Sequence, residues 1–136
     1  FYEKLAENNK QLYLIPKHEY DIYPYLYFAD TLISDTSSVI NEFLALGKFG
    51  IIYVLPHFKR KHSDGMDVLS IDPKEWLKGA FPHMFKPADL IPAVESALYP
   101  SPDMKKKLEE YRSYFFYGLD GNSSKRVKEK IDELIK

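Results

Sequence analysis

The sequence contains no cysteine among its 136 residues. This absence excludes thiol nucleophiles, thiolate zinc sites and disulfide bonds. The chain also has no apolar run near the ~20 residues that a membrane-spanning helix needs, and no signal-peptide pattern opens it. We therefore expect a cytoplasmic protein. Neither sign of charge is in excess, since the formal net charge is -1, which argues against general nucleic-acid binding.

What is present is the composition of an ordinary globular domain, with 45% hydrophobic and 29% charged residues. A chain of this length buries roughly two thirds of the surface that it would expose when unfolded. We expect residues 1–136 to form a single domain around one core. The chain begins at Phe1, without a methionine, inside an apparent helix. We therefore expect a fragment that lacks an N-terminal domain.

Apolar runs typical of buried strands alternate with stripes of helical spacing. Strands are predicted at residues 12–15, 31–33 and 51–55, with a further short strand at 66–71. Helices are predicted at residues 22–29, 39–46, 89–98, 102–114 and 123–135. Because parallel strands need crossover helices, the alternation predicts an α/β fold: a Rossmann-like parallel sheet with flanking helices.

A polar cluster, residues 34–38, follows the strand predicted at 31–33 and opens the next helix. In such folds ligands bind beyond the carboxyl ends of the strands. The first N–H groups of the helix, its dipole and the hydroxyls of Thr36, Ser37 and Ser38 could together hold a diphosphate. Alternatively, these residues could serve only to cap the helix, as Ser, Thr and Asp do at most helix starts. Glu42, one turn after Ser38, could accept from a ribose diol or could be a solvated carboxylate.

The residues around this cluster resemble a known family. Residues 34–43, Ser-Asp-Thr-Ser-Ser-Val-Ile-Asn-Glu-Phe, are followed by Leu46-Gly47-Lys48, preceded by Ile15-Pro16-Lys17-His18, and joined later by Asp120-Gly121 with Arg126 beyond. Together they are similar to the C-terminal domain of the CDP-glycerol glycerophosphotransferases, which build teichoic-acid and related polyol-phosphate polymers. The resemblance covers residues 12–135 and implies the C-terminal half of a GT-B fold.

The resemblance also implies roles for individual residues. Ser37 and Ser38 would contact the donor diphosphate and Glu42 the ribose. His18 would be catalytic, stabilising charge on the leaving nucleotide as a hydrogen-bond donor or cation. The complete set of implied donor contacts is Thr36, Ser37, Ser38, Glu42, Asp120 and Gly121. No metal and no cofactor are expected, because His57 and His62 lack a carboxylate pattern beside them.

The chain departs from the family at residues 56–62, where a basic loop stands in place of an expected acidic residue. The loop could clamp phosphate, contact an anionic acceptor or a membrane surface, or be a solvated charge run. The expected function is the donor-binding domain of a transferase that moves glycerol phosphate, or a similar phosphopolyol, from a CDP-linked donor to a cell-wall or capsule polymer. The expected partners are CDP-glycerol, a polymer or lipid-linked acceptor and the missing N-terminal domain, at the inner membrane face.

Two alternatives stay open. The domain could belong to a UDP-sugar glycosyltransferase or a 2-epimerase, which carry a similar small-residue helix start followed by an acidic residue. It could also be a non-catalytic α/β binding module in which the serine cluster only caps a helix. Under the leading hypothesis the isolated fragment binds donor without turnover, because the acceptor-activating base lies in the other domain.

Overall fold

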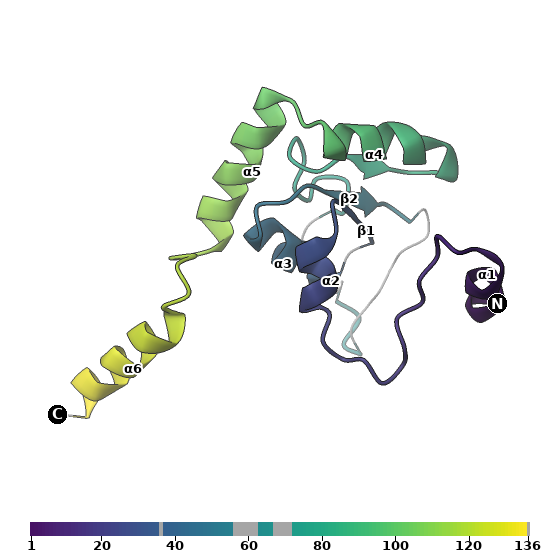
Figure 1. The fold of residues 1–136 in the computed structure, drawn as a ribbon. Helices are drawn as coiled ribbons and strands as arrows, with labels where there is room; N and C mark the ends of the chain where they lie inside the picture. Colours follow the sequence, from purple (N-terminus) through teal and green to yellow (C-terminus); the bar gives the residue numbers. More distant parts are fainter. Residues whose placement is uncertain (36, 56–62, 67–71, 136) are drawn as a thin grey trace.

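Three parallel strands form the centre of the fold. The computed structural model describes residues 1–35, 37–55, 63–66 and 72–135. Within these, β1 (Leu32–Ser34), β2 (Gly50–Tyr53) and β3 (His83–Met84) lie side by side in that order. Ile33 is paired with Ile51, and Ile52 with His83. Helices α3 and α4 lie on opposite sides of the sheet (Figure 1), so the predicted α/β, Rossmann-like fold class is confirmed.

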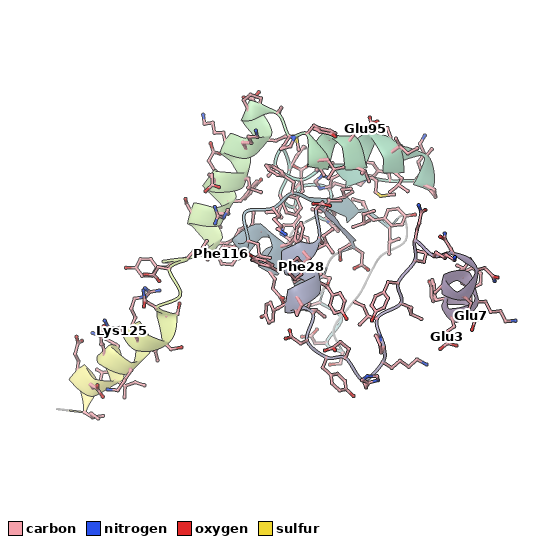
Figure 2. The ribbon with its side chains drawn as sticks, viewed as in Figure 1. Glu3, Glu7, Phe28, Glu95, Phe116 and Lys125 are labelled. Carbon is pink, nitrogen blue, oxygen red and sulfur yellow. The ribbon has the colours of Figure 1, made fainter. Side chains whose placement is uncertain are left out.

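The helices lie close to their predicted places. The five predictions at 22–29, 39–46, 89–98, 102–114 and 123–135 are confirmed with small shifts at the ends. Charged side chains such as Glu95 and Lys125 point outward (Figure 2). The helical elements are α1 (Tyr2–Asn8), α2 (Tyr23–Phe28), α3 (Val39–Ala45), the 3₁₀ turn η1 (Pro87–Asp89), α4 (Leu90–Leu98), α5 (Pro102–Phe115) and α6 (Ser123–Leu134).

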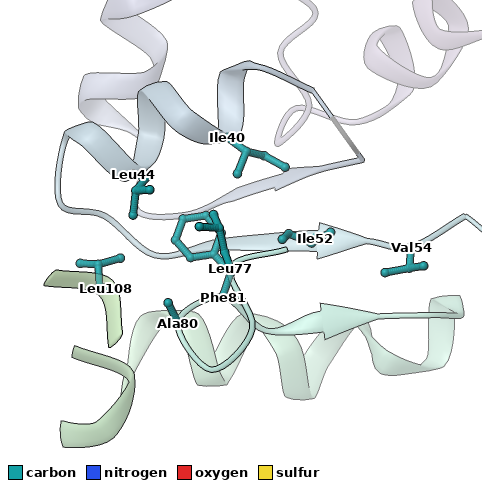
Figure 3. Packing of buried hydrophobic residues seen from close by; sticks show 8 residues of the cluster. All are labelled: Ile40, Leu44, Ile52, Val54, Leu77, Ala80, Phe81 and Leu108. Carbon is teal, nitrogen blue, oxygen red and sulfur yellow. The ribbon is translucent and has the colours of Figure 1, made fainter. Parts of the chain in front are cut away.

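The core lies on both faces of β2. Ile52 packs on one face with Ile40 of α3 and Leu108 of α5 (Figure 3). Ile51 points to the other face and packs against Ala93 of α4. Because successive strand residues point to opposite faces, a strand covered on both sides has no polar positions. This arrangement explains the uninterrupted apolar run in the sequence.

The prediction of a strand at residues 12–15 is wrong. All four side chains are exposed, and the segment forms no strand between α1 and α2. A strand needs a neighbour to complete its hydrogen-bond ladder, and β1 pairs only with β2 among the described residues.

The short strand β3 was not predicted. Its two residues are too few to give a periodic signal. Its place is fixed by the bonds from Ile52 N to Pro82 O and from Val54 N to Met84 O, both 2.9 Å. The strand predicted at 66–71 falls largely outside the described residues.

Lys48 ties α2 to the end of α3. Gly47, with φ of +72°, ends α3 in the left-handed conformation that glycine adopts without strain. The next residue, Lys48, directs its Nζ at the last turn of α2. It donates to the carbonyls of Leu26 at 3.1 Å, of Ala29 at 2.8 Å and of Tyr27. A cation at a helix C-terminus satisfies carbonyls that lack helical partners.

Replacing Lys48 with methionine should destabilise the protein. The change keeps the aliphatic stem but leaves three carbonyls without their charged donor, and a hydrogen bond to a charged group contributes about 1.5–3 kcal/mol. Urea unfolding should therefore show a loss of that order. The control is Lys125→Met on exposed α6, which should change the free energy of unfolding by less than about 0.5 kcal/mol. Equal effects of the two changes would show that Lys48 does not cap α2.

Candidate functional site

Ser37 and Ser38 lie just beyond the carboxyl end of β1, where α3 begins. Ser38 occupies the N-cap position, but its side chain makes no cap hydrogen bond. The local turn is held by the backbone instead, with Ser37 N donating to Asp35 O at 2.9 Å and Ile40 N to Ser37 O at 3.1 Å. Neither serine hydroxyl bonds to another described residue. The two serine hydroxyls are therefore available to a ligand.

Glu42 lies one helical turn after Ser38, on the same face of α3. Its side chain is half-buried, and its carboxylate has no hydrogen-bond or ion-pair partner in the described part of the chain. Its backbone N–H donates to Ser38 O at 3.4 Å. A half-buried carboxylate without a partner is able to accept from a ligand hydroxyl pair.

Asn41 was not among the predicted site residues. Its Oδ1 is buried and accepts no hydrogen bond from the described residues. Most buried polar atoms have a partner, and an unpaired one costs about 1–3 kcal/mol. Only the burial of this atom marks it, and burial of one amide cannot be read from residue type. Asn41 therefore joins the candidate residues beside Glu42.

Two features of the predicted site fall outside the described residues. These are Thr36, between the polar end of β1 and Ser37, and the basic loop at 56–62. Their predicted contacts with a donor stay predictions.

His18 lies in an exposed turn of the segment that joins α1 to α2. The turn is closed by Glu19 N, which donates to Pro16 O at 2.9 Å. No hydrogen bond or ion pair joins the His18 ring to the described residues. No hydrogen bond therefore links His18 to Ser37 or Ser38 in the described part of the chain, and its catalytic role stays a prediction.

Asp120 and Gly121 form the turn between α5 and α6. The Asp120 carboxylate accepts from Asn122 N at 3.0 Å and, through both oxygens, from Arg126 Nη1 at 2.9 Å. Arg126 also donates through Nη2 to Gly118 O at 3.0 Å. Gly121 has φ of +73°, which favours glycine. Arg126 thus holds this Asp-Gly turn in place through Asp120 and Gly118. The predicted contact of the turn with a donor stays a prediction.

A cavity of about 510 Å³ is lined both by residues of this turn and by residues at the end of α3. Gly121 and Ser123 line it together with Ala45 and Leu46, at the end of α3 opposite to Ser38. Arg112 lines it as well and donates through Nη2 to Ala45 O at 3.2 Å. The predicted site residues therefore occupy three places: the start of α3, the turn before α6 and the segment before α2.

The Asp120 carboxyl in this turn has a lowered pKa. The backbone N–H of Asn122 and then the Arg126 guanidinium lower the pKa of this carboxyl from 3.8 to about 2. Both groups donate to the ionised form, which they favour over the protonated one. A lowered pKa in the folded state means that this group stabilises the fold above pH 3.8 and loses that contribution as the pH falls toward 2.

Replacing Arg126 with methionine should raise the pKa of Asp120 without restoring it to 3.8, because the Asn122 N–H stays in place. NMR titration of the side-chain carboxyl carbon measures this pKa directly. The control is Lys128→Met, whose ammonium pairs with Asp132 instead. A pKa that does not change in the Arg126 variant would contradict the bidentate geometry.

Among the described residues, no three histidine, aspartate or glutamate side chains gather in a way that could hold a metal ion. No helix in the described ranges is long and apolar enough to cross a bilayer.

The comparisons with known proteins point to one family. A family model described as CDP-glycerol:poly(glycerophosphate) glycerophosphotransferase matches residues 2–133. The searches for similar curated proteins and for similar solved structures gave no match. The matched range runs from the start of α1 to the last turn of α6. It therefore includes β1, α3, Arg112 of α5 and Arg126 of α6. The chain therefore belongs to the CDP-glycerol:poly(glycerophosphate) glycerophosphotransferase family.

Proposed function

We propose that the chain is the donor-binding domain of a transferase that moves glycerol phosphate, or a similar phosphopolyol, from a CDP-linked donor to a polymer acceptor. Membership of a glycerophosphotransferase family supports the reaction class. One observation carries the location of the donor. The hydroxyls of Ser37 and Ser38 lie beyond the carboxyl end of β1 with no partner among the described residues, and Glu42, also without a partner there, lies one turn after Ser38 on the same face of α3.

In the proposed complex the two hydroxyls donate to the diphosphate and Glu42 accepts from the ribose diol. An acceptor oxygen attacks the phosphorus that carries the glycerol, and the bond from that phosphorus to the bridging oxygen breaks. CMP leaves with the added negative charge. Hydrogen-bond donors aimed at the departing phosphate stabilise this charge. His18 supplies such a donor if its segment reaches the carboxyl edge of the sheet.

In this arrangement the chain is the C-terminal half of a GT-B fold, and the acceptor binds to the other domain. The acceptor base is then outside the described residues, and the chain alone binds donor without turnover. The polymer would be a teichoic-acid or capsule chain extended at the cytoplasmic face of the membrane.

Changing Ser37 and Ser38 together to alanine should weaken CDP-glycerol binding, measured by isothermal titration calorimetry. Each hydrogen bond to a charged phosphate contributes about 1.5–3 kcal/mol, so about tenfold or more in affinity is expected per hydroxyl. Thermal stability should stay within about 0.5 kcal/mol, because neither hydroxyl caps α3. The control is Ser124→Ala, at an exposed position of α6, which should change neither binding nor stability. A loss of stability with unchanged binding would contradict the proposal.

Changing Glu42 to glutamine should separate the ribose contact from the phosphate contact. We expect weaker binding of CDP and unchanged binding of inorganic pyrophosphate, which has no ribose. Titration of CDP-glycerol and a UDP-sugar against the unaltered chain tests the base. Tighter binding of the uridine ligand would favour a sugar transferase or epimerase, and no binding of either at millimolar concentration would favour a non-catalytic module.

A further inference from the structure

The proposed donor site at the start of α3 has no positive side chain among its described residues. The hydroxyls of Ser37 and Ser38 are neutral, and Asp35 and Glu42 in the same segment are carboxylates. A diphosphate brings further negative charge to this place. Bound phosphates are usually neutralised by lysine, arginine or a metal ion, because a bound charge without an opposite charge is costly. A cation is therefore expected elsewhere along the same edge of the sheet.

Lys86 follows β3 at this edge. Ile52 of β2 pairs with Ser34 of β1 on one side and with His83 of β3 on the other. Ser37 is the third residue after Ser34, and Lys86 is the third residue after His83. Because the three strands are parallel, both residues stand beyond the carboxyl edge of the sheet, where ligands bind in α/β folds.

The backbone at Lys86 is held in place, whereas its side chain is available. The N–H groups of Phe85 and Lys86 both donate to Asp89 Oδ2, at 2.9 and 3.2 Å. The backbone of Lys86 is extended, with φ of -150° and ψ of 159°. Its side chain is exposed and forms no ion pair with another described residue. Among the described residues that directly follow the three strands, Lys86 is the one cation.

The width of the sheet allows Lys86 to reach a diphosphate that lies at the serines. Neighbouring strands are about 4.8 Å apart, so about 10 Å separates the backbones of β1 and β3. The four-carbon stem of a lysine and a bound diphosphate together bridge a gap of this size. An ammonium carries three donors and binds phosphate as a point charge, so it needs no fixed planar geometry.

We propose that Lys86 binds the donor diphosphate from the side of β3, opposite to the hydroxyls of Ser37 and Ser38. This inference rests on the proposed function, since it takes the diphosphate to lie at those hydroxyls. The ammonium pairs with the phosphate that stays on the nucleotide. When the bond from the bridging oxygen to the glycerol-bearing phosphorus breaks, the electron pair stays on that oxygen, and the ammonium stabilises the added charge on CMP.

Replacing Lys86 with methionine tests the contact, with isothermal titration calorimetry as the measurement. Affinity for CDP-glycerol and for inorganic pyrophosphate should fall about tenfold, because each loses one charged hydrogen-bond donor. Affinity for cytidine, which has no phosphate, should not change. Lys86→Arg keeps the charge and should retain most of the affinity. The control is Lys105→Met at an exposed position of α5, which should bind all three ligands like the unaltered chain.

The double change of Ser37 and Ser38 to alanine separates failure of this inference from failure of the proposed function. If the double variant binds CDP-glycerol weakly and Lys86→Met binds it like the unaltered chain, the inference is overturned and the donor site stands. If neither change affects binding, the donor site is overturned as well. An equal loss of cytidine and pyrophosphate affinity in Lys86→Met would also overturn the inference, because the contact would not be with phosphate.

The basic loop at residues 56–62, which lies outside the described residues, is the other source of positive charge in the sequence near this edge. A chain with Lys59→Met and Arg60→Met tests it against Lys86. We expect Lys86→Met to lose more pyrophosphate affinity than this loop variant. Loss in the loop variant alone would make the loop the phosphate-binding cation and overturn the assignment to Lys86.

Discussion

The packing of α3 across β1 and β2 is the constraint on which the other features depend. Ile40 and Leu44 of α3 pack with Ile52 of β2 in the core. The strands that precede and follow α3 in the chain, β1 and β2, run parallel. A β–α–β connection of this kind has essentially one handedness. Once that packing forms, Ser38 is fixed at the carboxyl edge of the sheet and Leu46 at the opposite edge.

The two ends of α3 differ in how their polar groups are used. At the first end, hydroxyls and a carboxylate have no partners among the described residues. At the second end, Arg112 Nη2 donates to the Ala45 carbonyl and nearby Arg126 closes the turn through Asp120 and Gly118. Of the Arg112 and Arg126 donors there, the buried Arg112 Nε has no partner among the described residues. Groups without partners are available to a ligand, whereas groups already bonded hold the structure. This contrast favours the first end for donor binding and the second for joining α5 to α6.

Sequence reasoning succeeded where local chemistry decides structure. The helix predicted from residue 102 begins there because Ser101 caps it, accepting from Met104 N at 3.2 Å, and β2 follows from an apolar run buried on both faces. It failed at residues 12–15, because an apolar run indicates burial but does not show whether a neighbouring strand is available for pairing. The serine pair could be located by its place after a strand. That its hydroxyls cap nothing, and that the Asn41 Oδ1 atom is buried without a partner among the described residues, depends on atomic positions that residue types do not encode.

We propose that the donor binds at the start of α3 and not at the turn before α6. A titration of the isotope-labelled chain with CDP-glycerol, followed by amide NMR shifts, separates the two places. Shifts should gather at Ser37, Ser38 and Glu42, with little change from Tyr117 to Arg126. Shifts confined to the turn around Asp120 and Gly121 would rule out binding at the start of α3, as would no shift at either place.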